Sequence, residues 1–142
     1  MRFWPIALMF ALGAAVAAEP TGDTRVRLSK PAVRAELVAA VDGQLAAFRV
    51  EDWERAYGFA AQSFQGVVDL PQFVTLITRN YAVLWKNTRA EFGLPRDNGH
   101  VGIVPVRVFR GKDSEAYQWL MVYEGGHWRV TGVVPQRTEG GA

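Results

Sequence analysis

Few side chains in this sequence could take part in acid–base or metal chemistry. Its two histidines are His100 and His127, and it contains no cysteine. Two histidines alone do not supply the ligand set of a metal site, and the sequence has no glycine-rich phosphate loop and no nucleophile elbow. Asp52 and Asp69 are explained as helix caps. The sequence therefore predicts no metal, no cofactor and no catalytic residue; only His100 is expected near the mouth of a pocket.

The aromatic side chains are the second candidate set. Tyrosine hydroxyls and indole N–H groups can orient a ligand inside an apolar pocket, but the same rings can equally fill a hydrophobic core. Both interpretations remain open from the sequence. The candidate ligand-binding residues are Tyr57, Tyr81, Trp85, His100, Trp119 and Trp128.

The composition limits the classes of partner. The chain has 142 residues, which fits one domain, and hydrophobic residues make up 49% of it, as in globular proteins. It carries 16 lysines and arginines against 14 acidic residues. So small an excess of positive charge does not create the basic surface that binds nucleic acid, and no nucleic-acid partner is expected.

The first residues have the order of a secretory signal peptide. Arg2 precedes the apolar run Phe3 to Val16, which is shorter than the roughly 20 residues that span a membrane, and small residues follow it. We predict a signal peptide over residues 1–18, cleaved near Ala18, and a flexible lead-in over residues 19–28. An uncleaved anchor is the alternative. After cleavage the protein would be periplasmic or secreted, without membrane attachment. Loss of Arg2 would leave 16 − 1 = 15 basic and 14 acidic residues in the mature chain.

Helical periodicity predicts three helices in the first half of the mature chain. The first follows Ser29, which we expect to be its cap. The second covers about residues 53–64 after Asp52. The third begins after Asp69 and can continue to Trp85, and Gln72 completes the pattern of a capping box at its start.

From residue 88 onward, alternating apolar and polar residues predict strands. The segment LPRDNG is a turn, a long strand follows it, and Gly125-Gly126 suits a two-residue hairpin turn because glycine accepts positive φ angles. Pairing outward from this turn places Tyr123 opposite Trp128 and Trp119 opposite Gly132. Both tryptophans then lie on the face that the helices would cover.

The preceding strand is expected to join this hairpin through a four-residue loop over residues 111–114, which places Val106 beside Trp119. A slip of one residue would expose every inward side chain, so the alternation itself favours this face assignment. The outer face of the sheet would carry an apolar group made of Leu120, Val122 and Val133. We treat this group as a possible homodimer contact.

These elements define an α+β domain in which three N-terminal helices pack on a curled antiparallel sheet of about four strands, leaving a cone between them. The residues that mark the pattern are Phe48, Asp52, Ala56, Tyr57, Phe64, Phe73, Tyr81, Phe92, Gly126, Trp128, Arg129 and Gly132. Their order and spacing over residues 29–135 resemble the NTF2-like, or cystatin-like, superfamily and more narrowly the DUF4864 family, a domain of unknown function. Residues 136–142 would form a disordered tail.

The resemblance implies a fold and export but no established activity. A cysteine often follows the glycine that corresponds to Gly132 in the family, and Val133 stands there in this chain, so no thiol chemistry is implied. One hypothesis is a non-catalytic domain that binds a small apolar ligand, which requires a cavity of about 300 Å³ or more, or that associates with proteins. The alternative is an isomerase, dehydratase or hydrolase of the NTF2-like type, which requires an ionisable group inside the cone.

Overall fold

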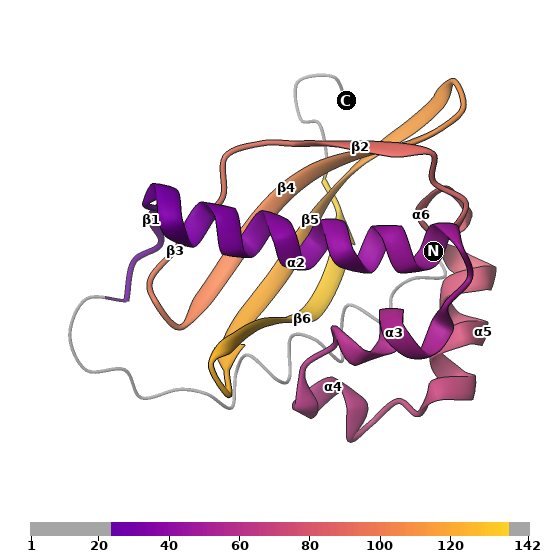
Figure 1. Cartoon of the computed structure of the whole chain (residues 1–142), viewed down its shortest axis with the longest axis horizontal. Coiled ribbons are helices and arrows are strands. Elements are labelled where there is room, and N and C mark those ends of the chain that lie inside the picture. Colours follow the sequence, from indigo (N-terminus) through magenta and orange to yellow (C-terminus); the bar gives the residue numbers. More distant parts are fainter. Residues whose placement is uncertain (1–23, 137–142) are drawn as a thin grey trace.

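The computed structural model describes residues 24–136, so the predicted signal peptide and residues 137–142 of the predicted tail lie outside the described residues. The described chain has an α+β fold in which helices lie against an open antiparallel sheet (Figure 1). Its elements are β1 (Arg27–Leu28), α2 (Pro31–Arg49), α3 (Trp53–Gly58), α4 (Gln62–Gln65), α5 (Leu70–Asn80), α6 (Ala82–Trp85), β2 (Arg89–Phe92), β3 (Arg96–Asp97), β4 (Val101–Arg110), β5 (Asp113–Glu124) and β6 (His127–Pro135). None of the described helices is long and apolar enough to cross a membrane.

The α+β class is confirmed, but the predicted numbers of elements are wrong. The described residues form five helices and six strands, whereas the sequence predicts three helices and about four strands. The sheet has the order β1-β3-β4-β5-β6, with β2 also paired to β4. Two of the strands missed are only two residues long, β1 inside the predicted lead-in and β3 inside the predicted turn, and such lengths are too short to show a periodic pattern.

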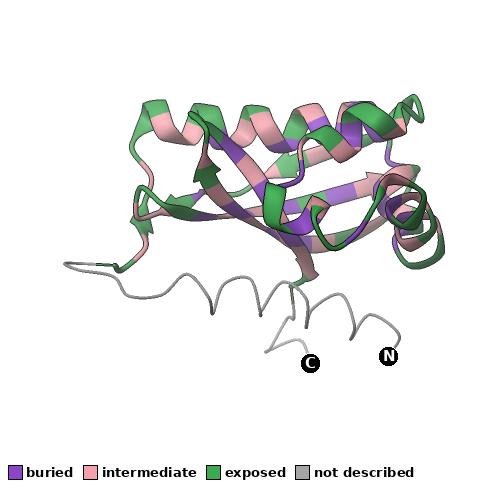
Figure 2. Cartoon of the chain, turned by 90° about the horizontal axis from the view of Figure 1, so that it is seen from below, coloured by how far each residue is buried: buried purple, intermediate pink, exposed green. Residues whose placement is uncertain are grey.

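Helix α2 runs across the inner face of the sheet (Figures 1 and 2). Leu37, Val41, Leu45 and Phe48 recur at helical spacing and are buried, which explains why this helix forms and which side it turns to the sheet. The predicted cap is wrong, because the N-cap residue is Lys30 and no side chain caps the helix. The hydroxyl of Ser29 instead donates to Asp97 Oδ1, and its backbone N–H bonds the carbonyl oxygen of Pro95 at 3.0 Å.

The predicted second helix is broken into α3 and α4. Asp52 caps α3 as expected, accepting a hydrogen bond from the Arg55 N–H at 3.2 Å. The break follows from pairing with β6. Val130 N–H donates to the carbonyl oxygen of Phe59, and Ala61 N–H donates to the carbonyl oxygen of Val130, both at 2.8 Å. Residues that make these strand-like bonds cannot also continue a helix.

The capping box at the start of α5 is confirmed in both directions. Asp69 Oδ1 accepts from the Gln72 N–H at 2.9 Å, and Gln72 Oε1 accepts from the Asp69 N–H at 2.8 Å. The helix does not continue to Trp85, because Tyr81 adopts a non-helical conformation with φ −134° and ψ 53°, and α6 starts anew after it.

The pairing of β4 with β5 is shifted by two residues from the predicted register. Trp119 lies opposite Val104, and Tyr117 lies opposite Val106. The reason is the turn, which contains two residues rather than four, with Gly111 at φ +61°. A shift of two residues preserves the side of the sheet on which each side chain lies. The predicted inner face is therefore correct, although the predicted cross-strand pairs of residues are wrong.

The hairpin of β5 and β6 begins as predicted and then changes register. Tyr123 lies opposite Trp128, and the turn glycines have φ of +59° and +82°. A β-bulge between Leu120 and Met121 then inserts one extra residue, Thr131, into β6. As a result Trp119 faces Val133 instead of Gly132. Val133 therefore lies on the inner face and packs against the core, so its predicted place on the outer face is wrong.

Candidate functional site

The two tryptophans of the predicted pocket are core residues. Trp119 is completely buried, and Trp128 is 6% exposed. The indole Nε1 of Trp119 donates to Gln44 Oε1 at 2.9 Å, and Gln44 Nε2 donates to the carbonyl oxygen of Ala56 at 3.1 Å. These bonds join β5, α2 and α3 inside the protein. Trp119 and Trp128 thus share a face, as predicted, but they contribute to packing there.

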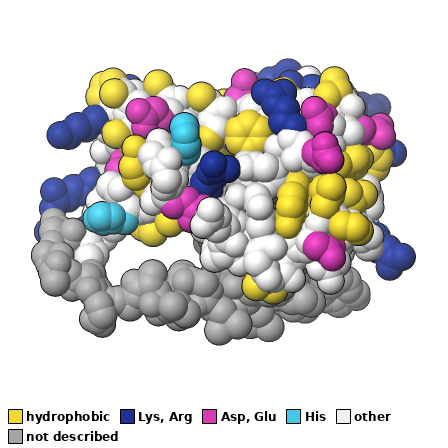
Figure 3. Space-filling view, turned by 60° about the horizontal axis from the view of Figure 1, so that its bottom comes forward, with side chains coloured by type: hydrophobic (Ala, Val, Ile, Leu, Met, Phe, Trp, Pro, Cys, Tyr) yellow, Lys and Arg dark blue, Asp and Glu magenta, His cyan; other side chains and the backbone are white. Residues whose placement is uncertain are grey.

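Three other predicted pocket residues do not line the small cavity described below. The hydroxyl of Tyr57 donates to the carbonyl oxygen of Val68 at 2.6 Å, so its polar end is already engaged. Trp85 packs at a tilt against Trp53 with ring centroids 5.6 Å apart, and its buried Nε1 has no hydrogen-bond partner among the described residues. His100 is exposed. Both histidines lie on the surface, near one end of the molecule (Figure 3).

A small cavity does exist between α2, α5 and β6, and its volume is about 30 Å³. Its lining residues are Gln44, Phe48, Ala60, Phe64, Phe73, Leu76, Ile77, Tyr81, Leu84, Val130, Thr131, Gly132 and Val133. Tyr81 is the one member of the predicted set among them. A space of this volume holds little more than a water molecule, whereas ligand pockets measure about 300 Å³ or more.

The chemistry of this cavity is almost entirely apolar. Tyr81 is the one lining residue with a titratable side chain, and burial raises its pKa to about 12. Its hydroxyl donates to the carbonyl oxygen of Val133 at 3.3 Å. The neighbouring Tyr117 also has a raised pKa. The main cause is burial, and the second is the hydrogen bond from its hydroxyl to Glu115. No residue lining this cavity gains or loses a proton near neutral pH, as a general acid or base must.

Metal binding has no support in the described part of the chain. Residues 24–136 contain no group of three or more histidine, aspartate and glutamate side chains close enough to hold an ion. One buried polar residue, Gln44, was not among the residues expected from the sequence to matter; it is 3% exposed. The sequence does contain a sign of its role, since this glutamine lies between Val41 and Leu45 and interrupts the apolar side of the helix. Its hydrogen-bond partners, however, cannot be predicted from the sequence.

The outer face of the sheet carries a group of apolar residues that we call the outer belt. The strand pairing places these residues on the side opposite the buried rings, in three neighbouring rows. They are Val101, Ile103, Pro105, Leu120, Val122 and Val134. Val101 is 43% exposed and the other five are partly exposed. Helix α2 lies on the opposite side of the sheet (Figure 2).

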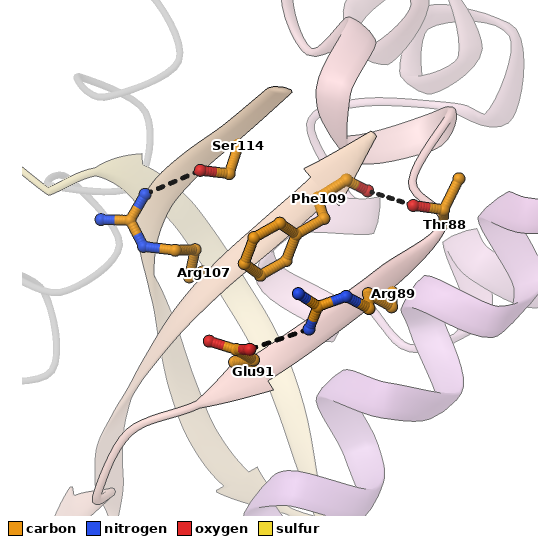
Figure 4. Close-up of polar contacts among 6 residues, drawn as sticks. All are labelled: Thr88, Arg89, Glu91, Arg107, Phe109 and Ser114. Carbon is orange, nitrogen blue, oxygen red and sulfur yellow. Dashed lines mark hydrogen bonds and ion pairs between the residues drawn. The ribbon is translucent and has the colours of Figure 1, made fainter. Parts of the chain in front are cut away.

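Charged and polar side chains border the outer belt where β4 approaches its turn (Figure 4). Arg89 lies over the ring of Phe109 at 3.8 Å from its centroid and forms an ion pair with Glu91 at 2.8 Å. Arg107 donates from Nη1 to the hydroxyl oxygen of Ser114 at 2.9 Å. This border consists of exposed groups with flexible side chains, which is typical of the polar rim of a protein contact.

The edges of the sheet are less suited to partners than this face. At one edge, Val130 already bonds the connection between α3 and α4, and the carbonyl oxygen of Val133 accepts from Tyr81. At the other edge, β1 has two residues and β2 has four, with Arg89 and Glu91 exposed. Short, charged or covered edges discourage the addition of further strands.

The fold and the site together define a class: an α+β domain with helices on one face of an antiparallel sheet, a filled interior and an apolar outer belt. Residues 30–141 match the model of a family described as "Domain of unknown function (DUF4864)". The chain belongs to this family, which confirms that part of the predicted resemblance; the wider NTF2-like superfamily remains a prediction. A comparison with curated proteins found no match.

Proposed function

We propose that the protein is an exported, non-catalytic domain that works by binding another protein through its outer belt. The observation that carries this proposal is the contrast between the two faces of one sheet. The inner face is filled, with about 30 Å³ of space in its cavity, while the outer face presents six apolar side chains to solvent. Contiguous exposed apolar patches with polar borders are typical of protein contacts.

The other two hypotheses have weaker support. A small apolar ligand would need about ten times the volume of the cavity between α2, α5 and β6. An acid–base enzyme would need a group that titrates near neutral pH in that cavity, and Tyr81, with a pKa of about 12, does not. Association through the outer belt requires neither.

Export is the first part of the proposal to test. We expect the full chain, expressed in a Gram-negative bacterium, to appear in the periplasm or medium with Glu19 as its first residue, because the small residues up to Ala18 suit signal peptidase. N-terminal sequencing and intact mass measure this. A chain that stays membrane-bound with Met1 or Arg2 at its start would contradict cleavage and favour the anchor.

Association is tested by cross-linking in the source cells. A photoreactive amino acid at Leu120, in the centre of the outer belt, should give a discrete cross-linked product of higher mass. The matched control is the same amino acid at Ala39, an exposed position on α2. Equal labelling at the two positions, or none at Leu120, would contradict the proposal.

A further inference from the structure

We propose that the partner of the outer belt is an acidic amphipathic helix of another protein, which lies along β4 and β5 with its apolar side on the belt and its carboxylates on Arg96 and Arg107. This inference rests on the proposed function and adds the chemistry and the geometry of the partner. It follows from the shape of the bare face, from the charges on that face, and from the positions of the two arginines.

A helix suits the outer belt better than an extended segment does. The short, charged or covered edges of the sheet discourage the addition of a strand. An extended segment laid across the face would press its backbone N–H and C=O groups against apolar side chains, where they have no partners. A helix satisfies these groups internally and presents only side chains. Helix α2 packs on the inner face of the same sheet in this way (Figure 2).

The dimensions of the outer belt agree with one helix. A helix is about 10 Å wide and neighbouring strands are about 4.8 Å apart, so one helix covers the rows of β4 and β5. The six steps from Val101 to Arg107 extend β4 by about 20 Å. About 13 residues of helix span the same length at 1.5 Å each. The apolar pairs of Val101 with Val122 and of Ile103 with Leu120 lie under this path.

The outer face carries more positive than negative side chains. The strand pairing places on it Arg89, Arg96, Arg107, Arg129, Glu91 and Glu124. Each carboxylate already has a polar partner: Glu91 pairs with Arg89 at 2.8 Å, and Glu124 accepts from the Gln62 N–H at 2.8 Å. Three of the four arginines have no carboxylate partner among the described residues. A partner with acidic side chains therefore complements this face.

Two of these arginines are free to bind a partner. Within residues 24–136, the side chain of Arg96 forms no hydrogen bond or ion pair, and Arg107 bonds only the hydroxyl oxygen of Ser114 at 2.9 Å (Figure 4). The guanidinium of Arg129, in contrast, donates to the carbonyl oxygen of Gly58 at 2.6 Å. Arg96 and Arg107 are therefore the cations that a carboxylate reaches without displacing a backbone contact.

The spacing of these two arginines defines the spacing of the acidic residues. Arg96 lies opposite Ile103, and Arg107 lies four residues further along β4, which corresponds to about 13 Å. Residues seven or eight positions apart in a helix lie on one side of it, about 11–12 Å apart. Two glutamates or aspartates at that spacing, on one flank of the apolar stripe, would reach both guanidinium groups.

An anionic bilayer is the competing partner for an apolar surface bordered by arginines. Surfaces that recognise anionic lipids gather about four to eight lysines and arginines in one cluster. The outer face has glutamates among its arginines, and the two free arginines are about 13 Å apart along the strands. This distribution favours an acidic protein segment.

Binding of two synthetic helices to the mature chain tests this chemistry. Both peptides have about 18 residues, because shorter isolated helices are marginal in water, and both carry the same leucine stripe. One has glutamates on its flanks and the other has lysines. By fluorescence anisotropy, we expect the glutamate peptide to bind about tenfold more tightly than the lysine peptide. Arg96→Glu and Arg107→Glu should each weaken the glutamate peptide about tenfold, and the double variant should prefer the lysine peptide.

Matched variants separate the outer belt from the rest of the surface. Arg79→Glu reverses an exposed charge on α5, changes the net charge as much as Arg96→Glu does, and should leave both affinities unchanged. Leu120→Ser removes an apolar side chain from the centre of the belt and should weaken both peptides. Val67→Ser changes a side chain that is 64% exposed between α4 and α5 and should weaken neither. Thermal melting checks that each variant is folded.

Three results would overturn the acidic helix as partner. The first is a lysine peptide that binds as tightly as the glutamate peptide. The second is charge reversal at Arg96 and Arg107 that has no more effect than charge reversal at Arg79. The third is a mature chain that ignores the glutamate peptide but binds phosphatidylglycerol vesicles through the same two arginines, which would assign the face to a bilayer.

Cross-linking in the source cells separates the failure of this inference from the failure of the proposed function. The photoreactive amino acid at Leu120 should join the chain to an acidic helical segment, identified by mass spectrometry. The product should decrease about tenfold when Arg96→Glu and Arg107→Glu are combined with it. If the same amount of product persists, association through the outer belt stands and only the acidic helix fails. If Leu120 cross-links to nothing, the proposed function fails as well.

Discussion

Replacing Trp119 with alanine is expected to lower the free energy of unfolding by about 3–5 kcal/mol, the usual range for removing a buried tryptophan. The side chain is completely buried and its ring packs edge-on against Tyr117, with centroids 6.1 Å apart. Its removal leaves a large void and also takes the donor away from Gln44 Oε1. A buried acceptor without a partner adds to the cost.

Chemical denaturation followed by circular dichroism measures this loss without relying on tryptophan fluorescence. Trp119→Phe is the informative control, since it keeps one buried ring in place but removes the indole N–H together with part of the ring volume. We expect it to cost about 1–3 kcal/mol, mainly from the unpaired glutamine. A Trp119→Ala variant as stable as the wild type would mean that the indole is exposed, and the assignment of the inner face would fail with it.

Alkaline pH should destabilise the protein through two buried tyrosines. Burial raises the pKa of Tyr81 to about 12 and also raises the pKa of Tyr117, against about 10 in an unfolded chain. Between pH 10 and 12 the unfolded state therefore binds fewer protons than the folded state, and stability falls as pH rises. Tyr81 alone accounts for roughly 3 kcal/mol over that range, and its contribution is fully present below pH 10.

Denaturant unfolding at pH 8, 9, 10 and 11 measures this dependence. Each of the two tyrosines adds up to about 1.4 kcal/mol per pH unit to the slope. Tyr117→Phe should make the curve shallower above pH 10, because it removes one of the two buried tyrosines whose pKa is raised. Equal slopes in the wild type and Tyr117→Phe would show that Tyr117 titrates normally in the folded protein.

Local signals in the sequence predicted the starts of two helices correctly. Asp52 and the pair Asp69 and Gln72 cap helices because their bonds join atoms within three residues of one another. Ser29 has the right chemistry but a long-range partner, Asp97, 68 residues away. Caps are therefore predictable where no distant group competes for the same side chain.

Alternation predicted the inner face of the sheet but not its partners. Trp119 and Trp128 share that face because successive side chains of a strand point to opposite faces of the sheet. An error of two residues in the register therefore leaves each side chain on its predicted face. The bulge at Thr131 could not be predicted, since it depends on how β6 meets both β5 and the connection between α3 and α4. Val133 was misplaced for that reason.

The candidate site was the least predictable feature. The aromatic residues were identified, but whether rings surround a space or fill it depends on packing at a scale of a few ångströms. The sequence is compatible with both outcomes. The apolar outer face was anticipated through Leu120 and Val122, whereas its full extent required the pairing of β4 with β5.

The extra residue in β6 couples the interior of this protein to its exterior. A regular ladder through the same sequence, without the bulge, would pair Trp119 with Gly132, so that Val134 would turn inward and Val133 would turn outward. One change of register would then alter the wall of the small cavity and the composition of the contact surface together. Changes that straighten or move this bulge, more than single substitutions on either face, would therefore alter both surfaces at once.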